Sequence, residues 1–236
     1  MHQEELAQRQ ANRIVRRHKR IPFQDNGRRM KRCLVALAGG PGSGKSTLAA
    51  MIAEKVSQQH VKCQVISIEG FMKPKAELSK QQMKRRGAIE TFDGNAVLRM
   101  FRVLRERGPG HELRAPSFDE ERRDPVQDDQ LIEADTEAII FEGIYLLADR
   151  EPWNNIESLV DEKWFIHVRP ELCRERVADR RTKKGICRTR DEALKQYDES
   201  DGLNNEFITK HRYQTDVIIE NNEELSLWEP DGDEVW

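Results

Sequence analysis

Short apolar runs alternate along the chain with segments in which apolar residues recur every three or four positions. Mainly apolar runs of this length are typical of strands that are buried on both faces of a sheet. The five runs that we expect to form strands span residues 33–38, 61–68, 138–147, 164–168 and 217–219.

Helical periodicity occupies several of the intervals between these runs. Leu48, Ile52 and Val56 are four residues apart, which predicts a helix directly after the first strand. A second amphipathic pattern runs from Val97 to Leu104 and stops at the Gly-Pro-Gly sequence 108–110. Strands that alternate with helices predict an α/β fold of three layers, in which a central parallel sheet lies between two layers of helices.

The composition is that of a folded protein rather than a disordered or membrane-spanning one. The 236 residues are 37% hydrophobic and 35% charged, and 40 Lys and Arg nearly balance 42 Asp and Glu, for a net charge of -2. Disorder requires low hydrophobicity together with a high net charge, and a membrane-spanning helix requires about 20 consecutive apolar residues. The chain shows neither pattern, so we expect a globular protein without a membrane partner.

The charges are distributed unevenly between the two ends. Residues 1–32 contain 10 Lys or Arg and 3 Asp or Glu, whereas residues 217–236 contain 7 Asp or Glu and no Lys or Arg. A basic segment can meet nucleic acid or anionic lipid, but it is more often the solvated face of a helix. Because Ala7, Ala11 and Ile14 recur at helical spacing, we expect part of the segment to pack, and we expect no nucleic-acid partner.

Nothing in the sequence indicates export. The N-terminus lacks the apolar core of a secretory signal, and Glu4 and Glu5 argue against a mitochondrial presequence. The four cysteines form no C-x-x-C pair, and the six histidines have no spacing typical of a metal site. We therefore expect reduced cysteines and a cytoplasmic protein.

The turn after the first strand carries a phosphate-binding motif. Residues 39–47 fit the Walker A pattern G-x-x-x-x-G-K-[ST], with a strand expected before it and a helix after it. Glycines let backbone N–H groups approach phosphate oxygens, and the helix N-terminus adds a positive dipole. Lys45 would place its charge on the β- and γ-phosphates, and the Ser46 hydroxyl would bind Mg²⁺. The predicted nucleotide-binding residues are Gly39, Gly40, Pro41, Gly42, Ser43, Gly44, Lys45, Ser46 and Thr47.

Motifs that mark other P-loop proteins are missing from the chain. It has no N-K-x-D sequence for guanine recognition and no run of four apolar residues followed by Asp-Glu. Residues 78–82 lack the glycines of the transporter ATPase signature. These absences favour a kinase over a GTPase or a transporter ATPase.

Five further motifs follow the P-loop along the sequence. They are Ser67–Met72, Arg85–Asp93, Pro116–Asp119 with Asp124-Pro125, Ile139–Tyr145, and an arginine-rich stretch Arg174–Arg181 with Asp201–Asn204. In this order they resemble motifs of the phosphoribulokinase, uridine kinase and pantothenate kinase superfamily of small-molecule kinases. The resemblance covers roughly residues 30–220. It is strongest to an uncharacterised branch with bacterial fructose-kinase-like proteins and fungal ATP-dependent-kinase-like proteins.

The resemblance implies roles for two carboxylates. Glu69 stands where the family has an aspartate taken as the general base, and its extra methylene moves the carboxylate by about 1.5 Å. Met72 replaces a family histidine nearby. Glu69 therefore either orients or deprotonates the acceptor hydroxyl, or only caps the next turn. Glu142 ends a buried strand, where it either binds Mg²⁺, directly or through water, or forms a salt bridge with a Lys or Arg.

The charged segment 170–213 resembles the helical lid of the same family. Arg174 and Arg180 are its candidate catalytic cations, which would stabilise charge on the transferring phosphoryl group. Charged helices are, however, usually solvated. Arg86, Asp93 and Asp119 are the candidate acceptor contacts, and each could equally be a turn or capping residue.

The combined features predict three segments and one reaction. The segments are a basic helix or arm at 1–30, a P-loop kinase domain at 31–220 and an acidic tail at 221–236. The reaction is ATP- and Mg²⁺-dependent transfer of the γ-phosphoryl group to a hydroxyl of a small sugar, nucleoside or vitamin-like metabolite, and a homodimer is left open. The alternatives are uridine or pantothenate kinase proper, and a catalytically weak ATP-binding protein with a regulatory or nucleic-acid-associated role.

Overall fold

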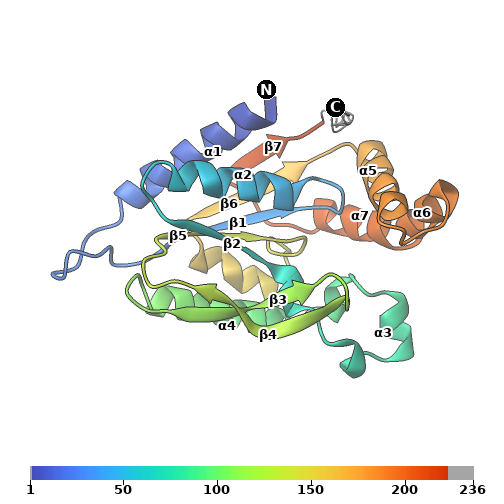
Figure 1. Cartoon of the computed structure of the whole chain (residues 1–236), viewed down its shortest axis with the longest axis horizontal. Coiled ribbons are helices and arrows are strands. Elements are labelled where there is room, and N and C mark those ends of the chain that lie inside the picture. Colours follow the sequence, from blue (N-terminus) through green and yellow to red (C-terminus); the bar gives the residue numbers. More distant parts are fainter. Residues whose placement is uncertain (1, 223–236) are drawn as a thin grey trace, which may run out of the picture.

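A five-stranded parallel sheet forms the centre of the structure (Figure 1). The computed structural model describes residues 2–222. Among these residues the strands lie in the order β2-β5-β1-β6-β7, and every neighbouring pair is parallel. The predicted α/β fold with a central parallel sheet is confirmed. The strand bounds are β1 Cys33–Gly39, β2 Cys63–Ser67, β5 Ala138–Glu142, β6 Glu162–His167 and β7 Val217–Glu220.

Helices cover both faces of the sheet, and the central strand β1 contributes to both cores. Its odd-numbered residues from 33 to 37 pack with α1 (His2–Lys19) and α2 (Lys45–Ser57). Its even-numbered residues from 34 to 38 pack on the opposite side with α4 (Gly94–Glu106). Successive side chains of a strand point to opposite faces. A strand covered on both sides must therefore be apolar throughout, as β1 is.

The basic N-terminal segment is packed into this arrangement as helix α1. Ala7, Ala11 and Ile14 are fully buried and belong to the core shared with α2. On its polar side Arg13 forms an ion pair with Glu162 at 2.7 Å. At least one basic side chain of α1 therefore forms an ion pair within the fold. The acidic segment expected at 221–236 lies outside the described residues, apart from Asn221 and Asn222.

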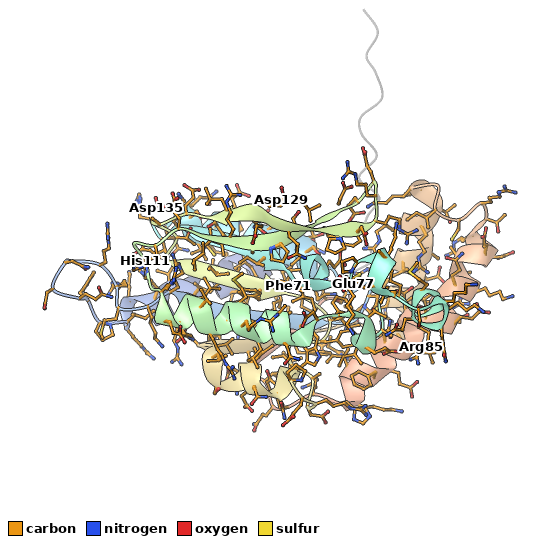
Figure 2. The ribbon with its side chains drawn as sticks, turned by 90° about the horizontal axis from the view of Figure 1, so that it is seen from below. Phe71, Glu77, Arg85, His111, Asp129 and Asp135 are labelled. Atoms are coloured by element: carbon orange, nitrogen blue, oxygen red, sulfur yellow. The ribbon has the colours of Figure 1, made fainter. Side chains whose placement is uncertain are left out.

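An antiparallel hairpin beside β2 was not predicted by the sequence. It consists of β3 (Leu113–Asp119) and β4 (Asp124–Ile132), in which polar and apolar residues are mixed and few side chains are fully buried. Gln130 Nε2 donates to the carbonyl of Val65 at 2.7 Å, which ties the hairpin to β2. Figure 2 shows this hairpin, with Asp129 labelled, on the same side of the molecule as Phe71. Strands held by polar contacts carry no apolar run, and this pair was therefore missed.

Three helices gather at the carboxyl end of the sheet (Figure 1). They are α5 (Pro170–Lys183), α6 (Arg190–Gln196) and α7 (Gly202–Lys210), and a π-helical turn at Tyr197–Asp201 joins α6 to α7. The carboxyl end is where ligands bind to open parallel sheets. These helices occupy the segment predicted as a lid, and its closing motion stays a prediction.

Two strands are shorter than the sequence predicted. The apolar run 138–147 is a strand only as far as Glu142, and the run 61–68 ends at Ser67. A Cβ on Gly143 would collide with the side chain of Ile68, so these two strand ends approach each other through a glycine. Residues 144–147 then fill the core as turn residues. An apolar run indicates which residues are buried, and in this segment the buried residues continue past the end of the strand.

Short helical turns connect the larger elements around the sheet. The short elements are η1 Ile68–Phe71, η2 Lys75–Glu77, α3 Lys80–Lys84, η3 Ile89–Thr91 and η4 Trp153–Leu159.

Within residues 2–222, no helix is both long and apolar enough to cross a membrane.

Candidate active site

Residues 39–47 form a tight glycine-rich loop between β1 and α2. Gly42 and Gly44 have φ of +81° and +83°, a conformation that residues with side chains rarely adopt. A Cβ on Gly40 would collide with the side chain of Asn205 on α7. Helix α2 begins at Lys45, which places a helix N-terminus at the loop. The loop therefore has the close packing and the dipole that a phosphate site requires.

Lys45 extends back over the loop that precedes it. Its Nζ donates to the carbonyl of Gly40 at 3.1 Å. Burial lowers the pKa of Lys45, while the negative charges of Glu142 and Glu69 oppose this shift. The two carboxylates favour the charged form of Lys45, and its ammonium group lies over the loop where phosphate groups would bind.

Ser46 and Glu142 meet at the ends of two neighbouring strands. The Ser46 hydroxyl donates to Glu142 Oε1 at 3.1 Å. Glu142 is only 5% exposed, although Ser46 is exposed to solvent. The two side chains present a hydroxyl and a carboxylate at one point, as the predicted Mg²⁺ ligands should.

This pair has the chemistry of a magnesium site that is completed by the nucleotide. Mg²⁺ prefers oxygen ligands and keeps several waters, so that one or two protein ligands plus substrate phosphates are usual. No group of three or more His, Cys, Asp or Glu residues that could hold a metal exists within residues 2–222. The residues present therefore fit a Mg²⁺ bound together with ATP, and they do not form an all-protein cage.

Glu69 lies at the next strand end along the sheet. It follows β2 in the turn η1, and β2 pairs with β5 so that Ser67 is opposite Glu142. Glu69 is open to solvent but has many protein atoms around it. This partial desolvation raises the pKa of Glu69. The negative charge of Glu142 raises that pKa further, and the positive charge of Lys45 lowers it. The side chain that caps the turn is Ser67, whose Oγ accepts the N–H of Glu69 at 3.3 Å.

The strand order brings these predicted residues together. Glu142 is opposite Leu37 on β1 and opposite Ser67 on β2, so β5 lies between the P-loop strand and the strand before Glu69. All three strands are parallel and end at the same edge of the sheet. Lys45, Ser46, Glu142 and Glu69 therefore surround one region at this edge.

The two candidate lid arginines lie in different surroundings. Arg180 lines the cavity beside the P-loop, and its positive charge lowers the pKa of Lys45 and of Glu69. Arg174 instead forms two hydrogen bonds with the exposed Asp198, both at 2.7 Å. Arg180 is thus near the other site residues, whereas Arg174 is held by a carboxylate on the helical segment itself.

Arg86 is held against the hairpin. Its Nη2 donates to Asp124 Oδ1 at 2.7 Å, its Nη1 donates to the carbonyl of Arg123, and its side chain is only 14% exposed. The guanidinium also lies over the ring of Phe118, 5.9 Å from its centroid. These contacts join two of the sequence motifs, but no contact of Arg86 with the P-loop is among them.

The remaining two acceptor candidates have local structural partners. Asp93 caps α4, where its Oδ1 accepts the N–H of Ala96 at 2.8 Å. Asp119 accepts the N–H groups of Glu121 and Arg122, both at 2.9 Å, in the turn of the hairpin. The capping and turn interpretations of these residues are therefore the ones that their hydrogen bonds favour.

Two asparagines of the site, Asn205 and Asn221, were missed by the sequence reasoning. Asn221 Nδ2 donates to the carbonyl of Ser43 at 2.9 Å, and Asn205 packs against Gly40. Asn204, which belongs to the predicted motif 201–204, donates from its Nδ2 to the carbonyl of Gly87, 3.2 Å away. The only available signal for Asn221 was position, because it lies two residues after the last predicted strand, 217–219. Asn205 lies within a helix whose sequence does not distinguish its inner face.

Comparison with known proteins assigns the chain to a family. A sequence profile of the Phosphoribulokinase / Uridine kinase family matches residues 34–226. The chain belongs to this family. A Schizosaccharomyces pombe protein named "Putative uridine kinase C227.14" is 37% identical over 199 residues, which cover 80% of this chain and 83% of that protein. YggC of Escherichia coli is 33% identical over 198 residues, which cover 82% of this chain and 80% of that protein.

Solved structures extend the likeness to the whole fold. A "putative fructose transport system kinase" from Silicibacter sp. TM1040 has a TM-score of 0.80 at 27% identity, and the match covers 90% of this chain and 98% of that one. YFH7 of Saccharomyces cerevisiae has a TM-score of 0.79 at 19% identity, and the match covers 92% of this chain and 99% of that one. The two proteins therefore share a fold. The predicted resemblance to P-loop small-molecule kinases is confirmed.

Proposed function

We propose that this family member is an ATP- and Mg²⁺-dependent kinase that phosphorylates a hydroxyl of a small metabolite. The observation that carries the proposal is the convergence of a phosphate loop, a hydroxyl–carboxylate pair and a second carboxylate at one sheet edge. Lys45 and the loop supply cationic contacts for the phosphates, and Ser46 with Glu142 supplies oxygen ligands 3.1 Å apart. Bound Mg²⁺ would neutralise charge on the β- and γ-phosphates.

Glu69 is the group that we assign to the acceptor. The acceptor oxygen attacks the γ-phosphorus directly, the bond from that phosphorus to the β–γ bridging oxygen breaks, and the hydroxyl proton passes to Glu69. ADP leaves with the bridging oxygen, and no phosphoenzyme forms. The raised pKa of Glu69 suits this role because a carboxylate that binds a proton more readily is a better base near neutral pH.

Arg180 is the lid residue that we assign to the transferring group. It is the predicted lid arginine whose charge acts on both Lys45 and Glu69. A cation at that point would stabilise the charge that develops on the phosphoryl oxygens during transfer. Arg174 would then act in the lid only through its contact with Asp198.

The test is ADP release by the purified protein with a panel of sugars, nucleosides and vitamins. We expect one class of acceptor to stimulate ADP release well above the ATP-only rate. Lys45→Ala should abolish the stimulation, while Lys55→Ala, in the last turn of the same helix, should not. Uridine or pantothenate as the stimulating acceptor would assign the protein to those better-known activities.

A contrary result would support the alternative of a weak or inactive ATP-binding protein. That result is the absence of stimulation by any panel member, together with salt-sensitive RNA or DNA binding that depends on the basic face of α1. Charge-reversing substitutions at exposed Arg9 and Arg16 test this dependence without removing the buried face of the helix.

A further inference from the structure

A cavity beside the P-loop is lined by residues of the loop and of α1, α2 and α5. It has a volume of about 550 Å³, within the range of about 300–1,000 Å³ that is usual for small-molecule sites. Gly42, Gly44 and Thr47 line it, whereas Glu69 and Glu142 do not. If phosphates occupy the loop, the cavity is therefore on the side away from the acceptor, where the rest of the nucleotide must lie.

The walls of this cavity suit the flat faces of a purine. Leu48 of α2 and Leu172 of α5 provide apolar surface. Arg176 provides a guanidinium that is fixed by two backbone carbonyls, that of Gly42 at 3.4 Å and that of Asn221 at 3.1 Å. A fixed guanidinium plane can stack on a heterocyclic ring.

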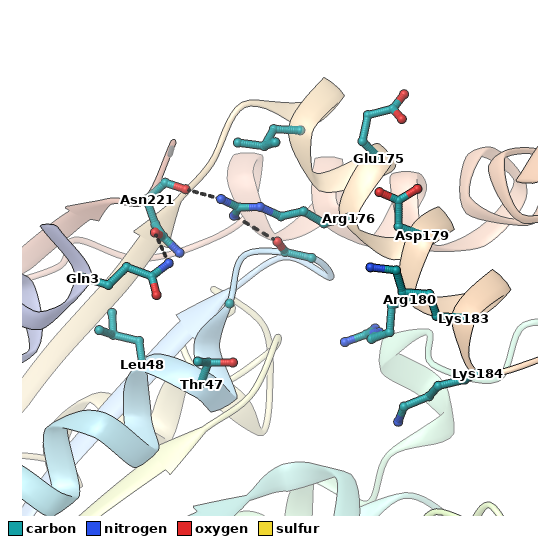
Figure 3. Close-up of a pocket in the computed structure, with 13 residues that line it drawn as sticks. Gln3, Thr47, Leu48, Glu175, Arg176, Asp179, Arg180, Lys183, Lys184 and Asn221 are labelled. Carbon is teal, nitrogen blue, oxygen red and sulfur yellow. Dashed lines mark hydrogen bonds between the residues drawn. The ribbon is translucent and has the colours of Figure 1, made fainter. Parts of the chain in front are cut away.

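One wall comes from a helix outside the region that the family profile matches. Gln3 of α1 lines the cavity, and the matched region begins only at residue 34. Figure 3 shows Gln3 reaching from α1 toward Asn221, next to Leu48. Gln3 Nε2 donates to Asn221 Oδ1 at 3.4 Å.

The orientation of the Gln3 amide is determined by a chain of hydrogen bonds. The carbonyl of Ser43 can only accept, so Asn221 must direct its Nδ2 toward it, at 2.9 Å. Asn221 then presents Oδ1 to Gln3, which must answer with its own Nε2. The Gln3 amide oxygen is left as the acceptor available to a ligand among the contacts described for residues 2–222.

We infer that Gln3, fixed through Asn221 and the P-loop carbonyl of Ser43, makes the nucleotide site selective for adenine. Its amide oxygen accepts from the 6-amino group of adenine, and the second hydrogen on Nε2 is available to a ring nitrogen; a paired contact of this kind is a common mode of adenine recognition. A 6-oxo purine in the same pose would place its 6-oxygen against the amide oxygen of Gln3, and the two acceptors would repel each other. This inference rests on the proposed function, since it requires a nucleotide in the P-loop.

The first experiment measures binding of ADP and of inosine diphosphate, which differ at the purine 6-position, by calorimetry with Mg²⁺. The wild-type protein should bind ADP about tenfold more tightly, because one good paired base contact gives discrimination of this order. Gln3→Ala should remove most of that preference. Gln8→Ala is the matched control, since Gln8 lies on the same helix, is exposed and bonds to Asn12 instead; it should keep the wild-type ratio.

The second experiment separates the cavity from the phosphate loop. Gln3→Trp, which fills the cavity, should weaken ADP binding at least about tenfold and leave binding of inorganic tripolyphosphate within about twofold. An unchanged ADP preference in Gln3→Ala, or wild-type ADP affinity in Gln3→Trp, would overturn the inference while the proposed kinase function stands. Failure of the wild-type protein to bind either ADP or tripolyphosphate would overturn both.

Discussion

The nucleotide side of the site and the acceptor side are built in different ways. On the nucleotide side, nine consecutive residues (39–47) form the loop, with left-handed backbone conformations at Gly42 and Gly44, and Asn205 and Asn221 only contact it from outside. On the side proposed for the acceptor, the candidate residues Glu69 and Arg86 come from separate segments, and Arg86 is positioned by the hairpin through Asp124. The first side is local in sequence, and the second is assembled by the fold.

The difference teaches where chemistry and specificity reside in this chain. A P-loop binds phosphate through backbone N–H groups, one lysine and one hydroxyl, whose geometry is fixed within the loop itself. Outside the loop, segments that are far apart in sequence meet through exposed contacts such as the ion pair between Lys184 of the helical segment and Glu120 of the hairpin, at 3.2 Å. Exposed pairs of this kind are worth little individually, so they can change without loss of the fold.

The largest expected effect lies on the nucleotide side. Lys45→Ala should lower the turnover number by about 100- to 1,000-fold, because it removes a cation from the transferring phosphates. Glu142→Gln should show a similar loss, together with a higher Mg²⁺ concentration for half-maximal rate, since Glu142 contacts Ser46 directly. Steady-state kinetics with varied Mg²⁺ measure both. A Glu142→Gln protein with a normal Mg²⁺ requirement would assign the metal to other residues.

The pH dependence of the rate sharpens the role of Glu69. Its pKa lies above the ordinary 4.5 because of partial desolvation and the charge of Glu142. The carboxylate form is lost as pH falls through this raised pKa, so kcat/KM should decrease on acidification at a higher pH than for a glutamate with the ordinary pKa. Glu69→Gln should remove this limb and lower the rate by about 100-fold or more, while Glu69→Asp should retain the limb and keep or raise the rate. A limb that persists in Glu69→Gln would exclude Glu69 as the base.

The same raised pKa makes a prediction about stability. In the folded state Glu69 binds its proton more tightly than in the unfolded state, so its ionised form lowers stability once the pH exceeds both pKa values. Glu69→Gln should therefore melt at a slightly higher temperature than wild type at pH 7.5. The advantage should shrink as pH falls toward the ordinary glutamate value. Calorimetric melting curves without nucleotide, at pH 7.5 and at the ordinary glutamate value of about 4.5, measure the difference in melting temperature between Glu69→Gln and wild type.

A comparison of two arginines tests which part of the helical segment acts at the site. Arg180→Ala should lower the turnover number by about tenfold or more, because its positive charge acts on both Lys45 and Glu69. Arg174→Ala should change it by less than about twofold, since Arg174 is paired with exposed Asp198. Equal losses in the two variants would mean that the segment acts as a unit when it closes, and would contradict their separate assignment.

The smallest expected effect concerns the hairpin turn. Asp119→Ala should lower the free energy of unfolding by about 1 kcal/mol, as loss of a capping side chain usually does, because Asp119 accepts two backbone N–H groups there. Glu121→Ala, exposed in the same turn, serves as the control. Urea titration measures stability, and the KM for the acceptor measures recognition. A raised KM with unchanged stability would make Asp119 an acceptor contact after all.

The sequence predicted most of the nucleotide side and part of the acceptor side. The Walker A residues, the strand before them and the helix after them are continuous, so their motif carries their geometry. Glu142 and Glu69 could be placed at strand ends because parallel strands end at one edge of the sheet. The hairpin could not be predicted, since its strands mix polar and apolar residues without an apolar run, and it is tied to β2 by a polar contact, that of Gln130 with Val65.

Two kinds of residue remained beyond sequence reasoning. Asn205 and Asn221 reach the P-loop from elements that are more than 150 residues away in sequence, and asparagine is too common in surface turns to mark a site. Arg174 and Arg180 have the same chemistry on one helix. Their difference arises from Asp198, which belongs to the π-helical turn after α6 and which no pattern in the sequence pairs with either of them.

The central claim is that the γ-phosphoryl group passes from ATP to a small-molecule hydroxyl. The most direct measurement incubates the protein with ATP labelled in the γ-phosphate and a metabolite extract, and then identifies labelled compounds by mass spectrometry. Our account predicts a labelled phosphate monoester with the wild-type protein that is lost with Lys45→Ala and retained with Lys55→Ala. Label found only in inorganic phosphate, or covalently on the protein, would contradict it.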